Sequence, residues 1–184
     1  FGDVVIEYKL SSADDSTYSK NLPSAAGTYT ARFTVTETTD YEGLSETANF
    51  IVAKKDVTEP TIESKVYSGS NQVATVAQSG LYTVTTNAGG TNAGDYDVVL
   101  TLTDSNNYKW STTSEAAVTL TFTIKKVQLS IPEENNTVFT YTGSVQTYVL
   151  LANDNYTISG NSQTNAGTHK VTVSINDTAN YEWT

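Results

Sequence analysis

The chain has 184 residues, a formal net charge of -10 and a sequence pI near 4.4. Such an acidic chain has no electrostatic attraction to nucleic acid or to an anionic membrane surface. The absence of cysteine excludes disulfides, thiolate nucleophiles and the usual structural zinc sites. No apolar run is long enough to span a bilayer, so we expect no membrane insertion. Because the chain starts at Phe1 and contains no methionine, we expect it to be a piece of a longer protein.

The composition favours β-strands, with twelve tyrosines and only three prolines. The first segment, residues 1–55, carries "AGTYTARFTVTETTDYEG" and closes with "ANFIVAKK". Its alternation predicts a strand with Tyr29, Ala31, Phe33 and Val35 on the inner face. The polar run that follows predicts a turn before the closing strand.

The second segment, residues 56–126, adds an opening element, "VYSGSNQ", and contains "AGDYDVVLTLTDSNNYKW" and "LTFTIKK". The pattern places the side chains of its main strand alternately inward and outward. The predicted inward side chains are those of Tyr96, Val98, Leu100 and Leu102. It is the one segment in which all three elements are present.

The third segment, residues 127–184, contains the opening element "TYTGSVQ" from Thr140 and "AGTHKVTVSINDTANYEW" from Ala166. Its predicted inward side chains are those of His169, Val171, Val173 and Ile175. The closing element is absent, so the neighbouring strand is expected to present an open edge. Gly27, Gly94 and Gly167 each lie 14 residues before a tyrosine, which indicates three copies of one unit.

These motifs resemble the tandem bacterial immunoglobulin-like repeats of large cell-surface proteins. The resemblance rests on "VYSGSNQ" and "TYTGSVQ", on "NAGDY" and "NAGTH", and on closing strands that end in lysine. It implies an extracellular protein of many modules, of the kind that serves as a stalk or an adhesin. The expected fold is all-β, with tandem immunoglobulin-like β-sandwich repeats in a semi-rigid row. The units are shorter than an immunoglobulin domain of about 100 residues, so compact β-grasp-like repeats are the alternative.

His169 is the only histidine and takes the place of Tyr29 and Tyr96. We therefore interpret it as a packed ring with a hydrogen-bond partner rather than a catalytic or metal-binding residue. Tyrosines recur at one position, and tryptophans follow two of them. They are predicted to pack, and sugar stacking on the tryptophans is the alternative. These residues are Tyr41, Tyr108, Tyr181, Trp110 and Trp183.

Several kinds of polar side chain are candidate sites. Turn residues with oxygen ligands suit either turn formation or calcium binding; they are Asp40, Asp104, Asn106, Asn107 and Asp177. Lysines that end strands are expected to be solvated, with a Lys–Asn isopeptide bond as the alternative; they are Lys54, Lys55, Lys125 and Lys126. Sequons at Asn135, Asn155 and Asn176 are expected to be accidental. The acidic pairs Asp14–Asp15 and Glu133–Glu134 identify no site.

No nucleophile elbow, phosphate loop or HExxH motif is present in the sequence. We expect no catalytic residue, no cofactor and no metal ion, and therefore not an enzyme. The leading hypothesis is a structural spacer or stalk segment of a bacterial cell-surface or secreted protein, contacting neighbouring repeats of the same chain. The alternative is an adhesin module that binds glycan or a host protein.

Overall fold

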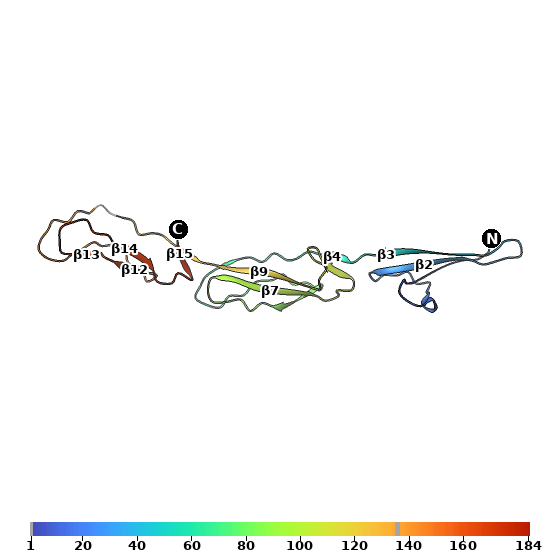
Figure 1. The fold of residues 1–184 in the computed structure, drawn as a ribbon. Coiled ribbons are helices and arrows are strands. Elements are labelled where there is room, and N and C mark those ends of the chain that lie inside the picture. The colour runs from blue at the N-terminus through green and yellow to red at the C-terminus, as the bar shows by residue number, and fades with distance from the viewer. Residues whose placement is uncertain (1, 135–136) are drawn as a thin grey trace. The chain divides into compact units, whose positions relative to one another are not determined.

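The computed structural model describes residues 2–134 and 137–184, and the chain is all-β apart from one turn of 3-10 helix, η1 (Figure 1). The elements are β1 (Val4–Leu10), η1 (Asp15–Thr17), β2 (Gly27–Val35), β3 (Leu44–Val52), β4 (Lys55–Val57), β5 (Lys65–Val66), β6 (Tyr82–Thr86), β7 (Gly94–Leu102), β8 (Tyr108–Trp110), β9 (Ala117–Lys125), β10 (Val127–Leu129), β11 (Gln146–Thr147), β12 (Tyr156–Ser159), β13 (Ser162–Gln163), β14 (Thr172–Ile175) and β15 (Tyr181–Trp183).

The strands form several small sheets. The two larger ones have the orders β1-β2-β3 and β5-β9-β7-β6, and the two-stranded ones are β4-β8, β10-β15, β11-β13 and β12-β14. The chain divides into two compact units. Unit 1 consists of residues 1–61, 77–85 and 99–119, and unit 2 of residues 62–76, 86–98 and 120–184. Each unit is described by itself below.

In unit 1, β1, β2 and β3 pair antiparallel along their full length. The pairing places Tyr29 directly opposite Phe50, and their rings stack with centroids 5.7 Å apart. Tyr8 meets the same Phe50 ring edge-on at 6.0 Å. Such cross-strand aromatic pairs stabilise a sheet face. Tyr29 is accordingly buried.

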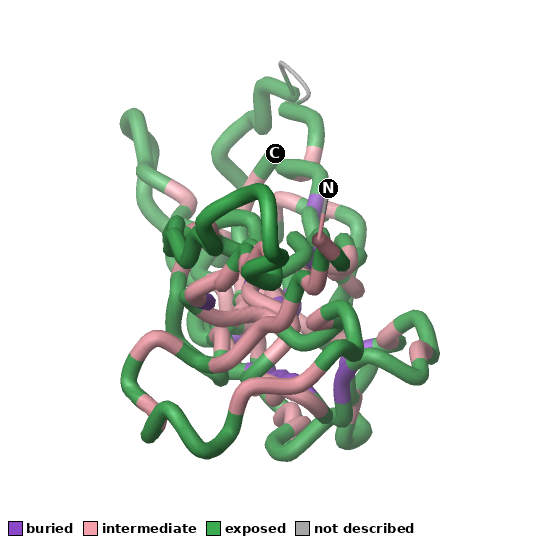
Figure 2. The backbone as a smooth tube through the Cα atoms, turned by 90° about the vertical axis from the view of Figure 1, so that its right-hand side faces the viewer, coloured by how far each residue is buried: buried purple, intermediate pink, exposed green. Residues whose placement is uncertain are grey.

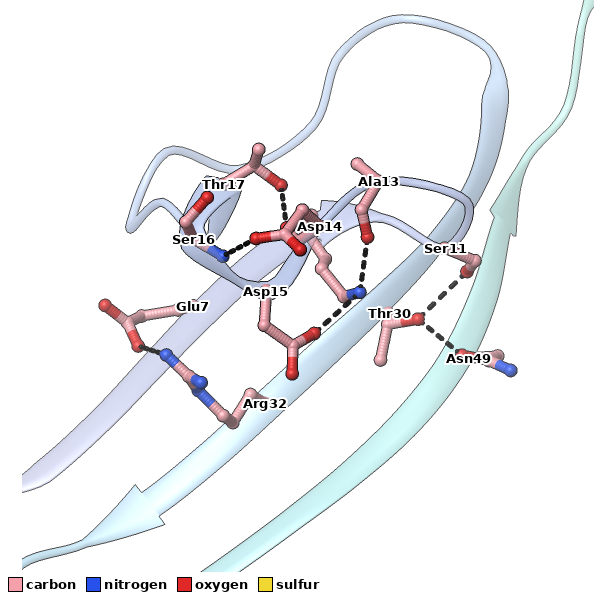
Figure 3. A network of polar contacts seen from close by, with 11 residues as sticks. Glu7, Ser11, Ala13, Asp14, Asp15, Ser16, Thr17, Thr30, Arg32 and Asn49 are labelled. Carbon is pink, nitrogen blue, oxygen red and sulfur yellow. Dashed lines mark hydrogen bonds and ion pairs between the residues drawn. The ribbon is translucent and has the colours of Figure 1, made fainter.

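The opposite face of this sheet carries charged side chains that hold the loop after β1 (Figure 3). Arg32 and Glu7 form an ion pair at 2.8 Å, and the Arg32 guanidinium lies 3.8 Å from the centre of the Tyr18 ring. Lys9 forms a second ion pair with Asp15, also at 2.8 Å. The sheet in unit 1 thus has one aromatic and one charged face.

The predicted inner stripe of the first segment is only partly buried. Tyr29 is buried, and Ala31 and Val35 are half-buried. Phe33, expected to face inward, is 37 % exposed. Its neighbours on the two flanking strands are Ile6 and Glu46, which are themselves exposed, so solvent reaches this end of the face.

The core of unit 1 also contains Trp110, which is fully buried. Its ring packs against Tyr82 with centroids 5.4 Å apart, and its indole N–H donates to the Ala116 carbonyl at 3.3 Å. Val57 and Leu102 of the same unit are buried as well. Trp110 is therefore a core residue.

In unit 2, β9 brings Phe122 and Ile124 into the core, where both are almost completely buried. The β5 strand pairs with β9 in parallel, with Lys65 opposite Ile124. On the other side of β9, the Tyr96 ring lies 6.5 Å from the Phe122 ring. Val98 is also buried, as the alternation predicted.

Fewer side chains are buried in the third segment than in the second. Val171, Val173 and Ile175 are half-buried and alternate with exposed residues, as predicted. Tyr156 is buried and packs against Trp183 with ring centroids 5.6 Å apart. The tube of Figure 2 is mostly coloured as exposed or intermediate, in keeping with the few buried residues.

The prediction of an all-β chain built from several sheets is confirmed. The sandwich type, the tandem arrangement and the boundaries at residues 55 and 126 stay predictions. Within the described residues, no helix is long and apolar enough to cross a membrane.

Replacing Trp110 by alanine is expected to lower the free energy of unfolding by about 3–5 kcal/mol, because it removes a fully buried ring and leaves a cavity. Trp183→Ala removes a half-buried ring and is expected to cost less. Urea unfolding followed by circular dichroism measures both. An equal loss in the two variants would contradict the assignment of Trp110 to the core.

Candidate functional site

The most distinctive polar arrangement lies where the first segment meets the turn before β8, within unit 1. The Asn107 side-chain oxygen accepts the Ala26 N–H at 2.7 Å, across 81 residues of sequence. The Asn107 side-chain nitrogen donates to Asp104 at 2.7 Å. Asp104 in turn accepts the backbone N–H groups of Asn106 and Asn107 at 3.1 and 3.2 Å. We call this arrangement the first Asp–Asn clasp.

Unit 2 contains a second clasp of the same form. The Asn180 side-chain oxygen accepts the Ala93 N–H at 2.7 Å, across 87 residues, and its nitrogen donates to Asp177 at 2.7 Å. Asp177 accepts the backbone N–H groups of Ala179 and Asn180. Asn180 is only 4 % exposed. A buried carboxamide with both ends bonded avoids the cost of an unsatisfied polar group.

Each clasp adjoins a short parallel strand pair. In unit 1 the Lys55 N–H donates to the Asn107 carbonyl at 2.9 Å, and β4 pairs in parallel with β8. In unit 2 the Val127 N–H donates to the Asn180 carbonyl at 2.9 Å, and β10 pairs in parallel with β15. In each unit the asparagine side chain therefore bonds the alanine before one strand, and the asparagine carbonyl accepts a backbone hydrogen bond at the start of the parallel strand pair.

The lysine before each of these strands adds one more bond. Lys54 Nζ donates to the Ser105 carbonyl, and Lys126 Nζ donates to the Thr178 carbonyl, both at 2.6 Å. Lys55 and Lys125 are exposed at strand positions. The structure thus places two of the four strand-end lysines on turn carbonyls rather than in solvent alone.

The charge of Asp104 is stabilised inside the first clasp. The hydrogen bond from the Asn107 side chain, together with the two backbone N–H groups and the nearby Lys54 charge, lowers the pKa of Asp104 below its ordinary value. Its carboxylate is therefore ionised at neutral pH and holds the turn as an acceptor.

Glu59 accepts hydrogen bonds beside the first clasp. It bonds the Ser111 hydroxyl at 2.6 Å and the Thr112 N–H at 3.1 Å, just after β8. These bonds, with that of the Thr112 hydroxyl, lower the pKa of Glu59 from 4.5 to about 2. Glu59 thus ties the end of β4 to the end of β8.

Two of the three turn carboxylates considered as calcium ligands, Asp104 and Asp177, belong to the clasps. Asp104 and Asp177 both accept hydrogen bonds from their own turns, and Asp40 is exposed. In the part of the chain that the structure describes, no group of three or more His, Cys, Asp or Glu residues could hold a metal ion. The arrangement is a turn, and its chemistry is hydrogen bonding.

The predicted burial of His169 is wrong, because this side chain is exposed. Its hydrogen bond is as expected: Nε2 lies 2.8 Å from the Asn165 carbonyl oxygen. The tyrosines at the same place make the same bond four residues back, Tyr29 to Ala25 at 3.0 Å and Tyr96 to Asn92 at 2.7 Å. The ring is held in place but not covered.

The other aromatic candidates divide by burial. Trp110 is inaccessible to a sugar ring, whereas Trp183 is half-buried. Tyr181 meets Tyr67 edge-on at 5.6 Å and Tyr108 is half-buried, but Tyr41 is 56 % exposed. The prediction that the repeated tyrosines pack against other residues is therefore confirmed for Tyr108 and Tyr181 but not for Tyr41.

The sequon asparagines and the acidic pairs do not belong to the clasps. The Asn176 side chain bonds Thr157 and the Asp154 carbonyl, while Asn155 is half-buried. Asn135 lies outside the described residues. The acidic pairs have separate roles: Asp14 caps η1 and Asp15 pairs with Lys9, whereas Glu133 and Glu134 are exposed.

The sequence patterns predicted that the residues of the clasps form turns, but they did not predict the long-range hydrogen bonds of these residues. A signal was present: "DSNNY" from Asp104 and "DTANY" from Asp177 share an Asp, an Asn three residues later and a Tyr. No family model, no curated protein and no solved structure matches this chain.

Asn180→Ala is expected to lower the free energy of unfolding by about 1–3 kcal/mol, because the half-buried Ala93 N–H loses its acceptor and Asp177 loses a donor. Asn107→Ala should act likewise at the first clasp. Asn106→Ala, at an exposed position of the same turn, is the matched control and should change stability little. Chemical denaturation of the three variants tests this, and equal effects would contradict the clasp.

Glu59 is expected to make stability depend on pH in the acidic range. Its folded pKa lies below its ordinary value, so its contribution is complete above about pH 4.5 and is lost as the pH falls toward 2. The difference in melting temperature between the parent chain and Glu59→Gln should therefore be largest at neutral pH and shrink toward pH 2. A difference independent of pH would refute the assignment.

Proposed function

We propose that this chain is a non-enzymatic structural segment, a spacer or stalk built from tandem immunoglobulin-like β-sandwich repeats of a bacterial cell-surface protein. The observation that carries the proposal is the Asp–Asn clasp, which occurs twice with the same donors, acceptors and distances. In each case it ties the Ala-Gly pair at the start of a strand, β2 or β7, to an Asp-to-Asn turn of the next segment. Such a contact restricts the rotation of one segment against its neighbour.

Further pairs of side chains support the repeat relationship between the second and third segments. Tyr82 and Tyr156 both donate to the carbonyl five residues back, of Ala77 and Leu151. The Gln72 and Gln146 side chains both donate to the carbonyl six residues back. Gly69 and Gly143 both have φ +77°, a conformation that favours glycine.

The spacer role agrees with what the polar side chains do. Those weighed as catalytic or metal-binding residues hold turns and strand ends, as in the two clasps. The adhesin alternative rests on the turn ends or on exposed aromatic residues, and Trp110, one of its candidate aromatics, is fully buried. The extracellular setting of the proposal rests on the resemblance of the motifs to repeats of cell-surface proteins.

The spacer proposal predicts a rigid first junction. The chain has no cysteine, so Thr47→Cys and Glu115→Cys give two unique labelling sites, both exposed and both in unit 1. Pulsed electron–electron double resonance between the two spin labels should give a narrow distance distribution. Asn107→Ala should broaden it, because the clasp to Ala26 is lost.

Asn106→Ala serves as the control and should leave the distribution narrow. A distribution that is broad in the parent chain, or equally narrow in all three proteins, would contradict the proposal that the clasp sets the junction.

A further inference from the structure

The first segment has a long loop that the second segment lacks. Residues 11–26 connect β1 to β2, whereas residues 87–93 alone connect β6 to β7. We call residues 11–26 the β1 cover. Side chains on the charged face of the sheet hold it in place (Figure 3). Lys9 pairs with Asp15 of the cover at 2.8 Å, and the Arg32 guanidinium lies 3.8 Å from the centre of the Tyr18 ring.

The β1 cover also bonds the backbone of β1 on the side away from β2. The Tyr8 N–H donates to the Ser19 carbonyl at 2.7 Å, and the Ser19 N–H donates to the Tyr8 carbonyl at 2.9 Å, as in an antiparallel ladder. Two residues further along β1, the Leu10 carbonyl accepts the Ala13 N–H at 2.9 Å. The cover thus occupies hydrogen-bonding groups at the outer edge of β1.

The place of β1 at a sheet edge is a feature of the repeated unit. The corresponding strand of the second segment, β6, stands last in the order β5-β9-β7-β6. However, β6 and β12 of the third segment have five and four residues, and most of these carry hydroxyl groups. Strand β1 has seven residues, VVIEYKL, with Val4, Ile6 and Leu10 exposed. A long apolar edge strand tends to pair with another chain, and this is the strand that carries a cover.

The sequence of β1 is complementary to itself in antiparallel orientation. When Tyr8 lies opposite Tyr8 of a second copy, Glu7 lies opposite Lys9 of that copy, and Ile6 lies opposite its Leu10. Opposite charges and apolar pairs directly across a ladder stabilise it. The central pair of this register needs a residue that directs its N–H and carbonyl outward. Tyr8 does so, since both groups bond Ser19.

We propose that the outer edge of β1 binds the same edge of a second copy of this chain, and that the β1 cover keeps it closed. The cover and the second copy compete for the same groups. Ser19 occupies the backbone of Tyr8, and Asp15 occupies the ammonium group of Lys9. Displacement of the cover frees both for a two-fold symmetric pair. This interaction surface goes beyond the spacer role and involves no contact between segments.

The test replaces residues 11–26 of the whole chain by the sequence of residues 87–93, NAGGTNA. This graft removes the cover but keeps an alanine before Gly27, whose N–H bonds Asn107 in the parent chain. In sedimentation velocity the parent chain should be a monomer, and the grafted chain should form a dimer whose fraction rises with concentration. Circular dichroism shows whether the grafted chain keeps its strands.

A milder variant keeps the full length of the cover. Asp15→Ala combined with Tyr18→Ala removes the ion pair to Lys9 and the ring beside Arg32. It should shift the same equilibrium toward the dimer, to a smaller extent than the graft, because the backbone bonds of Ser19 remain. This variant decides the matter if the grafted chain does not fold.

Charge reversal in the grafted chain tests the register. Lys9→Glu places like charges opposite each other at two symmetric sites and should weaken the dimer at least about tenfold. Lys55→Glu is the matched control, because it makes the same change of charge at an exposed position of β4. It should leave the dimer unchanged.

A cross-link gives a second measure of the register, since the chain has no cysteine of its own. Tyr8→Cys in the grafted chain should give a covalent dimer on oxidation. The Cα atoms of two residues in a hydrogen-bonded antiparallel pair lie about 5.5 Å apart, which a disulfide can span. Ile6→Cys should not give one, because it would face Leu10 of the second copy.

A monomeric grafted chain that keeps its strands would overturn the proposal, as would a milder variant that stays monomeric when the graft does not fold. A parent chain that dimerises as strongly as the grafted chain would do the same. So would a dimer that Lys9→Glu does not weaken, or equal cross-linking by Ile6→Cys and Tyr8→Cys. These readouts involve neither the Asn107 variant nor the spin labels, so they fail independently of the rigid-junction test.

Discussion

The two carboxamides of Asn107 and Asn180 are the groups on which the rest of the structure depends. A carboxamide has an acceptor at one end and donors at the other. The oxygen accepts the N–H of the alanine just before a strand of another segment, while the nitrogen donates to the aspartate of its own turn. An aspartate in the same place would supply the acceptor but not the donor.

The need for such a clasp follows from the size of the sheets beside it. The β4-β8 and β10-β15 pairs each have three residues per strand and only two strands. Isolated two-stranded pairings are marginal in water. The asparagine side chain, its carbonyl and the neighbouring lysine add bonds on the same turn, so the short pair forms part of a larger hydrogen-bonded network.

Periodicity in the sequence was enough to predict β2 and β7 but not the contacts between segments, and the strand predicted after Gly167 begins only at Thr172. Alternation identified the buried positions of β7, such as Val98 and Leu100, because it is a property of neighbouring residues. The bonds of Asn107 and Asn180 span 81 and 87 residues, and no local pattern specifies a partner at that distance. The first segment has Glu37 and Asp40 at the matching positions, which hid the shared motif.

The failed prediction for His169 has a similar cause. The predicted hydrogen-bond partner is present, since His169 Nε2 lies 2.8 Å from the Asn165 carbonyl oxygen, but His169 lies before β14, which begins only at Thr172. Burial at this position, however, is set by the adjacent strand: Phe50 covers Tyr29, and Phe122 lies against Tyr96. The ring that covers this site belongs to the closing strand, so burial here depends on which strand lies alongside and only secondarily on whether the residue is tyrosine or histidine.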